Sequence, residues 1–120
     1  MVLSGKSAEN RAAPEEVAQA TVSCFKNTVP DTVPGIVFLS GGQSDNEATV
    51  NLDAINKYAI ETGAPWELSF SYGRGLQAAP LNAWRGEKNN MAKAQSVFLQ
   101  RAFVTSAARN GAYSPSMEAV

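Results

Sequence analysis

The sequence has no histidine and a single cysteine, Cys24, among its 120 residues. Without histidine, the chain cannot by itself supply a Ser-His-Asp or Cys-His nucleophile. The usual zinc and transition-metal sites need histidine or several cysteines, so we expect no metal site. One cysteine also excludes an internal disulfide and favours a reducing compartment. Catalysis by these residues would have to use Lys, Asp, Glu, Tyr or backbone groups.

The chain also has little excess charge of either sign and no long apolar run. The sequence has ten Lys and Arg residues and eleven Asp and Glu residues, so its net charge is −1. This balance offers no general attraction to nucleic acid or to an anionic membrane. No stretch approaches the roughly 20 apolar residues of a membrane span, and residues 1–10 lack the apolar core of a signal peptide. We expect no nucleic-acid partner, no membrane span and a cytoplasmic location.

What the sequence does contain is an alternation of helical and strand patterns. Residues 1–13 are polar and are expected to form a loop. Ser44 followed three residues later by Glu47 is a capping box, which predicts a helix start. The predicted helices cover 14–29, 44–62, 74–85 and 87–110, and the predicted strands cover 35–40 and 66–72. Helices alternating with short strands predict an α/β fold with a parallel sheet.

The spacing of apolar residues also predicts which side chains are buried. In the first two helices the apolar faces are Val17, Ala18, Thr21, Cys24 and Phe25, then Ala48, Leu52, Ile55 and Ala59. We interpret Cys24 as a small buried packing residue, because no base or cation is evident beside it. In the last helix, Met91, Ala94, Phe98, Ala102 and Thr105 share one face and are expected to pack in the core. The continuous apolar run 35–39 is typical of a strand buried on both faces.

Both predicted strands end in serine and glycine. One ends in Ser40-Gly41-Gly42 and the other in Ser71-Tyr72-Gly73-Arg74. In a parallel sheet these ends lie at the same edge, and each leads into a helix whose first N–H groups are unpaired. Arg74 adds a planar guanidinium suited to phosphate oxygens. The pairing favours a phosphate site, although a glycine after a strand can also form a simple strand–helix turn.

Several segments, in this order, resemble class I fructose-bisphosphate aldolase. They span roughly residues 14–113 and are FLSGGQS (38–44), NLDAIN (51–56), PWELSFSYGRGLQ (65–77) and the AW (83–84) that precedes the last helix. The resemblance implies that residues 1–120 are the C-terminal part of a single (β/α)8 barrel domain, with strands 7 and 8 and their flanking helices. It also implies that the C1-phosphate of fructose 1,6-bisphosphate or dihydroxyacetone phosphate is held by Ser40, Gly41, Gly42, Ser71, Gly73 and Arg74.

The resemblance further implies a reaction: reversible cleavage of fructose 1,6-bisphosphate to dihydroxyacetone phosphate and glyceraldehyde 3-phosphate. In that family a lysine forms a Schiff base whose protonated imine accepts electrons, so neither a metal nor another cofactor is needed. This lysine is expected a few residues before a pair resembling Met1-Val2, so no catalytic residue is expected here. Lys6, in a polar loop, and Lys57, late on a helix, are poor replacements because solvated lysines stay protonated.

The resemblance also implies a homotetramer and contacts with the rest of the barrel. Tyr113-Ser114-Pro115-Ser116 matches a family segment that leads into a flexible tail ending in tyrosine, and this tyrosine is not among residues 117–120. Two strands cannot close a barrel of about 250 residues, so the isolated chain is expected to be inactive and prone to aggregate. The alternative is a non-catalytic phosphate-binding or interaction module derived from an aldolase. A Rossmann-type domain is disfavoured because G-x-G-x-x-G is absent.

Overall fold

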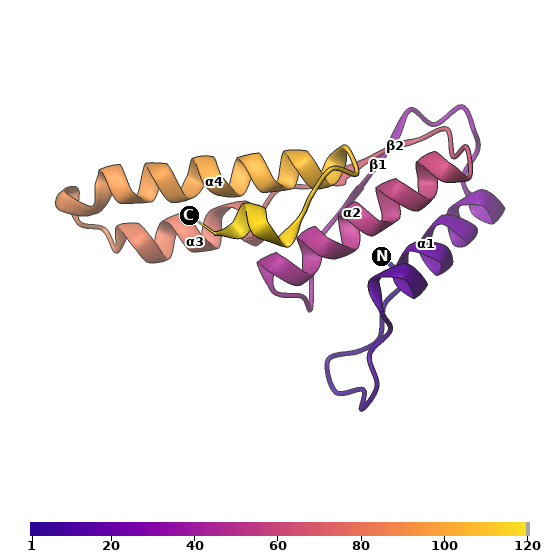
Figure 1. Ribbon diagram of the computed structural model, residues 1–120, viewed down its shortest axis with the longest axis horizontal. Helices are drawn as coiled ribbons and strands as arrows, with labels where there is room; N and C mark the ends of the chain where they lie inside the picture. The colour runs from indigo at the N-terminus through magenta and orange to yellow at the C-terminus, as the bar shows by residue number, and fades with distance from the viewer. Residues whose placement is uncertain (120) are drawn as a thin grey trace.

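The computed structural model describes residues 1–119, in which helices alternate with two short strands (Figure 1). The strands are shorter than the ranges 35–40 and 66–72, because each pairs only with the other along four residues. The last helix is preceded by a 3-10 turn, η1 (Lys88–Asn90), and another 3-10 turn, η2 (Pro115–Glu118), follows it. The elements are α1 (Pro14–Thr28), β1 (Gly35–Phe38), α2 (Asp45–Glu61), β2 (Glu67–Phe70), α3 (Arg74–Trp84) and α4 (Met91–Arg109).

The two strands form a parallel sheet that has helices on one face only. Gly35 pairs with Glu67 and Phe38 with Phe70. Side chains alternate along a strand, so Phe38 and Phe70 are buried beneath the helices, whereas Val37 and Leu39 are 63% and 73% exposed. The prediction that the run 35–39 is buried on both faces is therefore wrong for residues 1–119, because α1 and α2 cover one face and nothing described covers the other.

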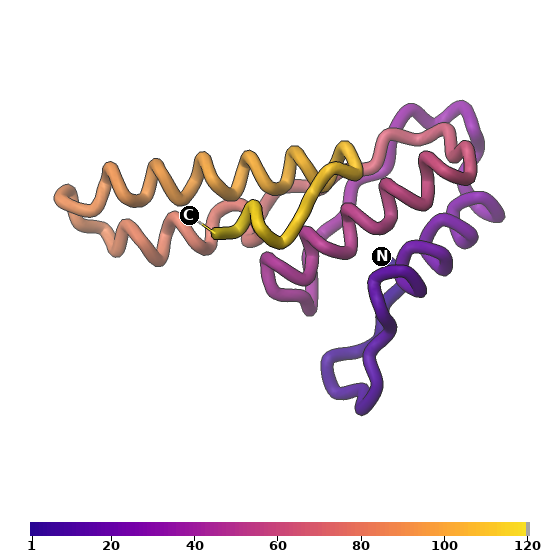
Figure 2. The backbone as a smooth tube through the Cα atoms, in the orientation of Figure 1, coloured from indigo at the N-terminus to yellow at the C-terminus, as the bar shows by residue number. Residues whose placement is uncertain are grey.

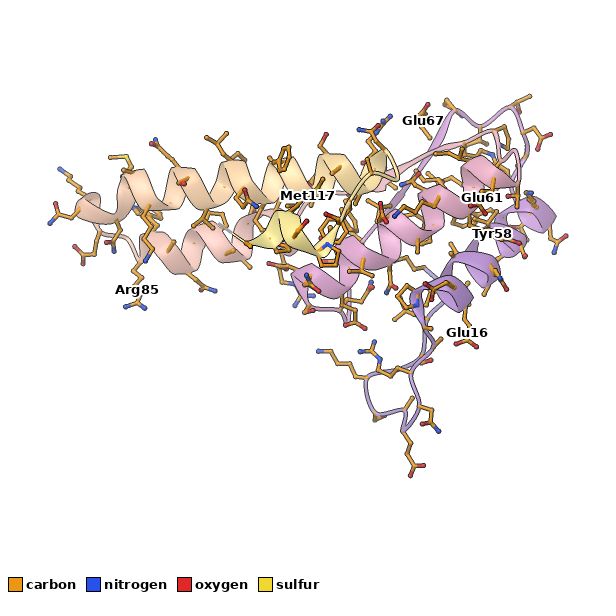
Figure 3. All side chains as sticks on the ribbon, viewed as in Figure 1. Glu16, Tyr58, Glu61, Glu67, Arg85 and Met117 are labelled. Atoms are coloured by element: carbon orange, nitrogen blue, oxygen red, sulfur yellow. The ribbon has the colours of Figure 1, made fainter. Side chains whose placement is uncertain are left out.

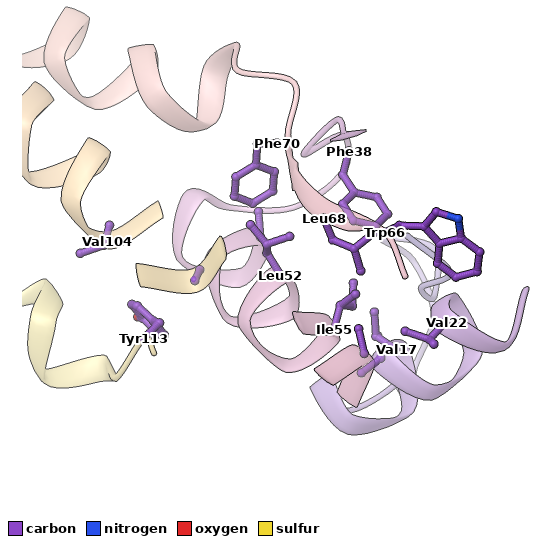
Figure 4. Close-up of a cluster of buried hydrophobic side chains, with 14 residues drawn as sticks. Val17, Val22, Phe38, Leu52, Ile55, Trp66, Leu68, Phe70, Val104 and Tyr113 are labelled. Carbon is purple, nitrogen blue, oxygen red and sulfur yellow. The ribbon is translucent and has the colours of Figure 1, made fainter. Parts of the chain in front are cut away.

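The main core lies between the sheet, α1 and α2 (Figure 4). The predicted buried side of α2 is confirmed, since Ala48, Leu52, Ile55 and Ala59 are all buried. The sheet contributes Leu68, and α1 contributes Val17 and Val22. The sheet, α1 and α2 each bury one apolar face in this core. The removal of these faces from water is the principal source of stability for the packed elements.

A buried amide joins three elements at the edge of this core. The side chain of Asn56 on α2 donates to the carbonyl oxygens of Leu52 at 3.2 Å, Leu68 at 3.1 Å and Ala108 at 3.1 Å. Leu68 belongs to β2 and Ala108 to α4, so the two N–H groups of this amide, shared among three carbonyl oxygens, join α2 to the sheet and to the C-terminal part of α4. A polar group this deeply buried is stabilising only when its hydrogen bonds are satisfied.

The prediction that Cys24 is buried is wrong: its side chain is exposed. The buried residues of α1 are Val17, Ala18, Thr21 and Val22. At 100° per residue, Cys24 falls at the margin of the face that these residues define. Helical spacing thus placed it near the apolar stripe, but the packing of α1 on α2 stops short of it.

Helices α3 and α4 form an arm that extends beyond the sheet (Figures 1 and 2). The first half of α4 has only α3 and η1 beside it, so Met91 and Phe98 are 51% and 42% exposed. The prediction that these two side chains pack in the core is wrong. They line an apolar groove of about 940 Å³ between α3 and α4. The prediction is confirmed for Thr105, which is buried with Arg101, Val104 and Ala108 in the half of α4 that reaches the body of the protein.

Candidate functional site

The two serine-glycine turns lie side by side at the carboxyl edge of the sheet. The Ser71 N–H donates to the Phe38 carbonyl oxygen at 2.8 Å, which keeps the strand ends in register as far as the turns. The Ser40 side chain lies against the first turn of α3, since a β-carbon placed on Gly75 would be 3.6 Å from the Ser40 Oγ atom. Ser40, Ser71 and Gly73 line one small hollow between the turns. The topology has therefore brought together residues that are more than thirty positions apart.

The first turn, residues 40–43, is closed by one backbone hydrogen bond. The Gln43 N–H donates to the Ser40 carbonyl oxygen at 3.0 Å. Gly42 has a φ of +80°, in the region where a β-carbon is strained. A φ of this sign at the third position is typical of a type II turn. Within residues 1–119, the N–H groups of Gly41 and Gly42 have no hydrogen-bond acceptor, and they remain available to a ligand.

The N-terminus of α2, which follows this turn, is already capped. The Glu47 N–H donates to the Ser44 Oγ atom at 3.1 Å, and the Ser44 N–H donates to a Glu47 carboxylate oxygen at 3.4 Å. The predicted capping box is confirmed. Asp45 and Glu47 place two carboxylates in the first turn, where they compensate the positive end of the helix dipole. This helix end is therefore a poor site for an anion.

The N-terminus of α3 is different, because no side chain caps it. Its N-cap residue is Gly73, and its first turn contains Arg74 and no acidic residue. In the described part of the chain, the N–H groups of Arg74 and Gly75 lack an acceptor, and the Arg74 guanidinium makes no ion pair or hydrogen bond. Free N–H groups, an uncompensated dipole and a nearby guanidinium together favour an anion.

The six residues predicted to bind phosphate are therefore not equivalent in the structure. Ser40, Ser71 and Gly73 line the shared hollow. Gly41, Gly42 and Arg74 are adjacent to it in the chain but do not line it. The sequence presents the two turns as alike, whereas the structure separates a self-capped helix start from an open one. That difference depends on the carboxylates of Asp45 and Glu47 in the first turn of α2 and on the absence of any acidic residue from the first turn of α3.

Sequence reasoning missed Arg101, which also lines the hollow and is only 7% exposed. Its guanidinium Nη1 atom lies 3.1 Å from both carboxylate oxygens of Glu118. Glu118 also accepts a hydrogen bond from the Tyr113 hydroxyl at 3.3 Å. Burial, and then the negative charge of Glu118, raise the pKa of the Tyr113 phenol, so that it stays protonated and can donate. The only sequence signal was a charge inside the apolar stretch 97–104.

Lys6 and Lys57 are both exposed to solvent. The Lys57 Nζ atom pairs with the Asp53 carboxylate at 2.6 Å, and its side chain is half exposed. Lys6 lies in the exposed N-terminal loop. Neither lysine lines the hollow at the sheet edge. Over residues 1–119, no three His, Cys, Asp or Glu side chains gather in a way that could hold a metal ion, and none of the helices is both long and apolar enough to cross a membrane.

Comparison with known proteins identifies similar chains along the whole sequence. The family described as "Glycolytic: Fructose-bisphosphate aldolase class-I" matches residues 1–120. The chain is 54% identical over 107 residues to the cytoplasmic isozyme of fructose-bisphosphate aldolase from Spinacia oleracea, which covers 89% of this chain and 29% of that protein. It is 49% identical over 118 residues to human fructose-bisphosphate aldolase C, which covers 98% of this chain and 32% of that protein.

A solved structure gives the same match in three dimensions. It is the fructose-bisphosphate aldolase from Plasmodium falciparum, in a ternary complex with TRAP and a small-molecule inhibitor, and it superposes with a TM-score of 0.87 at 48% identity. The match covers 95% of this chain and 32% of that chain. The 120 residues therefore span about 30% of the length of the relatives that they match.

Proposed function

The chain belongs to the class-I fructose-bisphosphate aldolase family, and we propose that its residues form the substrate phosphate cradle of such an enzyme. One observation carries this proposal. The uncapped N-terminus of α3 begins beside Ser40 and Ser71, and both serines line the same small hollow of about 10 Å³. A phosphate group lying over the mouth of this hollow would meet the two serine side chains, unpaired N–H groups and a positive helix end together.

Each residue of the cradle has a chemical role in this proposal. Ser40 and Ser71 donate hydroxyl hydrogen bonds to phosphate oxygens. Gly41, Gly42 and Gly73 lack β-carbons, so backbone N–H groups can approach the same oxygens closely. The exposed guanidinium of Arg74 contributes a charge-assisted hydrogen bond, which is stronger than a neutral one. Because the guanidinium has no partner within the described residues, binding a phosphate would not require breaking an existing ion pair.

The proposed substrate is fructose 1,6-bisphosphate, cleaved reversibly to dihydroxyacetone phosphate and glyceraldehyde 3-phosphate. Fixing the C1-phosphate holds the substrate ketone in one orientation, which lowers the entropic part of the barrier. The imine-forming lysine is proposed to lie outside these 120 residues, because Lys57 is paired with Asp53 and Lys6 is solvated. We further propose a complete barrel, a cytoplasmic location and a homotetramer, by analogy with the family.

The alternative is a non-catalytic, aldolase-derived module that binds phosphorylated ligands. Borohydride reduction in the presence of dihydroxyacetone phosphate separates the two possibilities, because it traps a covalent adduct only where a lysine forms an imine. The complete gene product should be labelled if it is an aldolase. Phosphate binding without labelling would favour the module.

The cradle itself is tested by the variant Arg74→Ala in the complete gene product. Loss of a charged hydrogen bond of about 1.5–3 kcal/mol should raise the KM for fructose 1,6-bisphosphate roughly tenfold or more. It should raise the inhibition constant of inorganic phosphate similarly and leave the melting temperature nearly unchanged. The matched control is Arg85→Ala, because Arg85 lies at the far end of α3, away from the sheet (Figure 3). Unchanged affinities in Arg74→Ala would refute the proposed cradle.

A further inference from the structure

We propose that Arg101 is a positioning residue of the phosphate cradle, an inference that rests on the proposed function above. Arg101 is buried near the middle of α4, where its guanidinium meets three other segments. The Nη1 atom pairs with both carboxylate oxygens of Glu118 at 3.1 Å, and the Nη2 atom donates to the Thr49 Oγ1 atom at 2.8 Å. These are the short, well-formed contacts of the side chain.

Two longer contacts connect the same guanidinium to the segments that build the cradle. The Nε atom lies 3.4 Å from the Gly75 carbonyl oxygen, in the first turn of α3. The Nη2 atom lies 3.4 Å from the Asp45 carbonyl oxygen, in the first turn of α2. Gly75 is also the residue against which the Ser40 side chain packs. One planar group therefore spans the helix starts that follow the two serine-glycine turns.

The charge of Arg101 is compensated, and this argues against direct phosphate binding. One guanidinium nitrogen, Nη1, pairs with both carboxylate oxygens of Glu118, whereas the guanidinium of Arg74 has no carboxylate partner within residues 1–119. A buried ion pair is costly to desolvate and adds little net stability relative to an apolar group of the same size. The pair has a larger effect on geometry than on stability, because a planar guanidinium with several partners fixes the orientation of those partners relative to one another.

The spacing between the two helix starts determines whether Ser40, Ser71 and the free N–H groups of α3 can reach one phosphate. Misplacement by about 1 Å at a reacting centre can lower rates by two orders of magnitude. Arg101 is the side chain in the described structure whose hydrogen bonds reach α2, α3 and η2 together. We therefore assign to it the maintenance of the cradle's shape, while Arg74 provides the direct contact.

The test compares Arg101→Lys with Arg109→Lys in the complete gene product. Both arginines lie on α4 and form carboxylate pairs, but Arg109 pairs with the exposed Glu67 far from the cradle (Figure 3). Lysine keeps the charge and loses the planar fork. Arg101→Lys should raise the inhibition constant of inorganic phosphate and the KM for fructose 1,6-bisphosphate about tenfold, whereas Arg109→Lys should leave both unchanged. Equal values for the two variants would overturn the assignment.

A second variant, Glu118→Ala, distinguishes positioning from direct binding and does not require Arg101→Lys to fold. Removing the carboxylate frees the guanidinium. If Arg101 orients the cradle, phosphate binding should weaken as in Arg101→Lys. Tighter phosphate binding would show Arg101 to be a direct ligand and would overturn the proposal. Arg74→Ala serves as the reference: if it weakens phosphate binding and Arg101→Lys does not, the positioning role fails while the proposed function stands.

Discussion

Gly41 and Gly42 are neighbours in one turn, yet only Gly42 has a φ in the left-handed region. A β-carbon on either residue would have no heavy atom within 4 Å, so the difference between them is conformational and not a matter of space. Gly42→Ala should lower the free energy of unfolding by about 1–2 kcal/mol, because an L-residue is strained there. Gly41→Ala is the control and should cost less than half as much. Urea unfolding of the two variants of the complete gene product measures the difference, and equal losses would contradict it.

Residue-scale prediction from sequence works where one local rule decides the outcome. The serines and glycines at 40–42 and 71–73 follow strands in a parallel arrangement, and that rule places them at one edge whatever else the fold contains. No local rule of this kind predicts the position of Arg101. A lone arginine in a helix usually marks the solvated face, and its burial here results from the meeting of α2, α3 and η2. The prediction for Cys24 was wrong in the opposite direction: the residue was expected to be buried and is exposed. Helical spacing shows the apolar face of a helix but not where the contact with its neighbour ends.

At the scale of the element, the start of α2 depends on a reciprocal cap. Ser44→Ala removes the acceptor for the Glu47 N–H, which is 3.1 Å from the hydroxyl oxygen. Such a loss typically costs about 1 kcal/mol. Ser44→Thr keeps an acceptor oxygen and should cost only a few tenths of a kcal/mol. Thermal unfolding of the complete gene product checks the pair, and a loss in Ser44→Thr as large as in Ser44→Ala would show that the cap does not matter.

The capping box and the apolar period of α2 could both be predicted from the sequence, because each depends only on residues close together in the chain. Four buried positions of α2 follow directly from the period of 3.6 residues. On α4 the same reasoning was right for Thr105 and wrong for Met91 and Phe98. Periodicity shows which face of a helix is apolar, but it does not show which part of that face has a partner. Within residues 1–119 the first half of α4 has only α3 and η1 beside it, and Met91 and Phe98 stay exposed.

At the scale of the whole molecule, the described structure is more extended than a compact domain of its size. Its radius of gyration is 15.4 Å, against about 14 Å for a compact chain of 120 residues. Its accessible surface is 7259 Å², against about 6200 Å² from the scaling for folded monomers of 12.7 kDa. The excess, on the order of 1000 Å², is accompanied by apolar side chains on the open face of the sheet and along the α3–α4 groove.

These two surfaces lead to a prediction for the 120-residue chain studied by itself. The open edges of β1 and β2 can pair with other strands, and the exposed apolar face can pack on a second copy. The isolated chain should therefore self-associate at micromolar concentration and show no measurable cleavage of fructose 1,6-bisphosphate. Sedimentation velocity and a coupled cleavage assay measure the two properties.

A surface variant separates apolar association from general misfolding in the isolated chain. Leu81 and Leu99 are exposed and line the groove, so changing both to glutamate replaces apolar contact area by charge without touching the buried core. If the groove drives association, the double variant should sediment as smaller species than the parent chain, while its helix content by circular dichroism stays the same. A parent chain that sediments as a monomer and cleaves substrate at the rate of an intact aldolase would contradict the prediction, because the sheet of two strands would then suffice for activity.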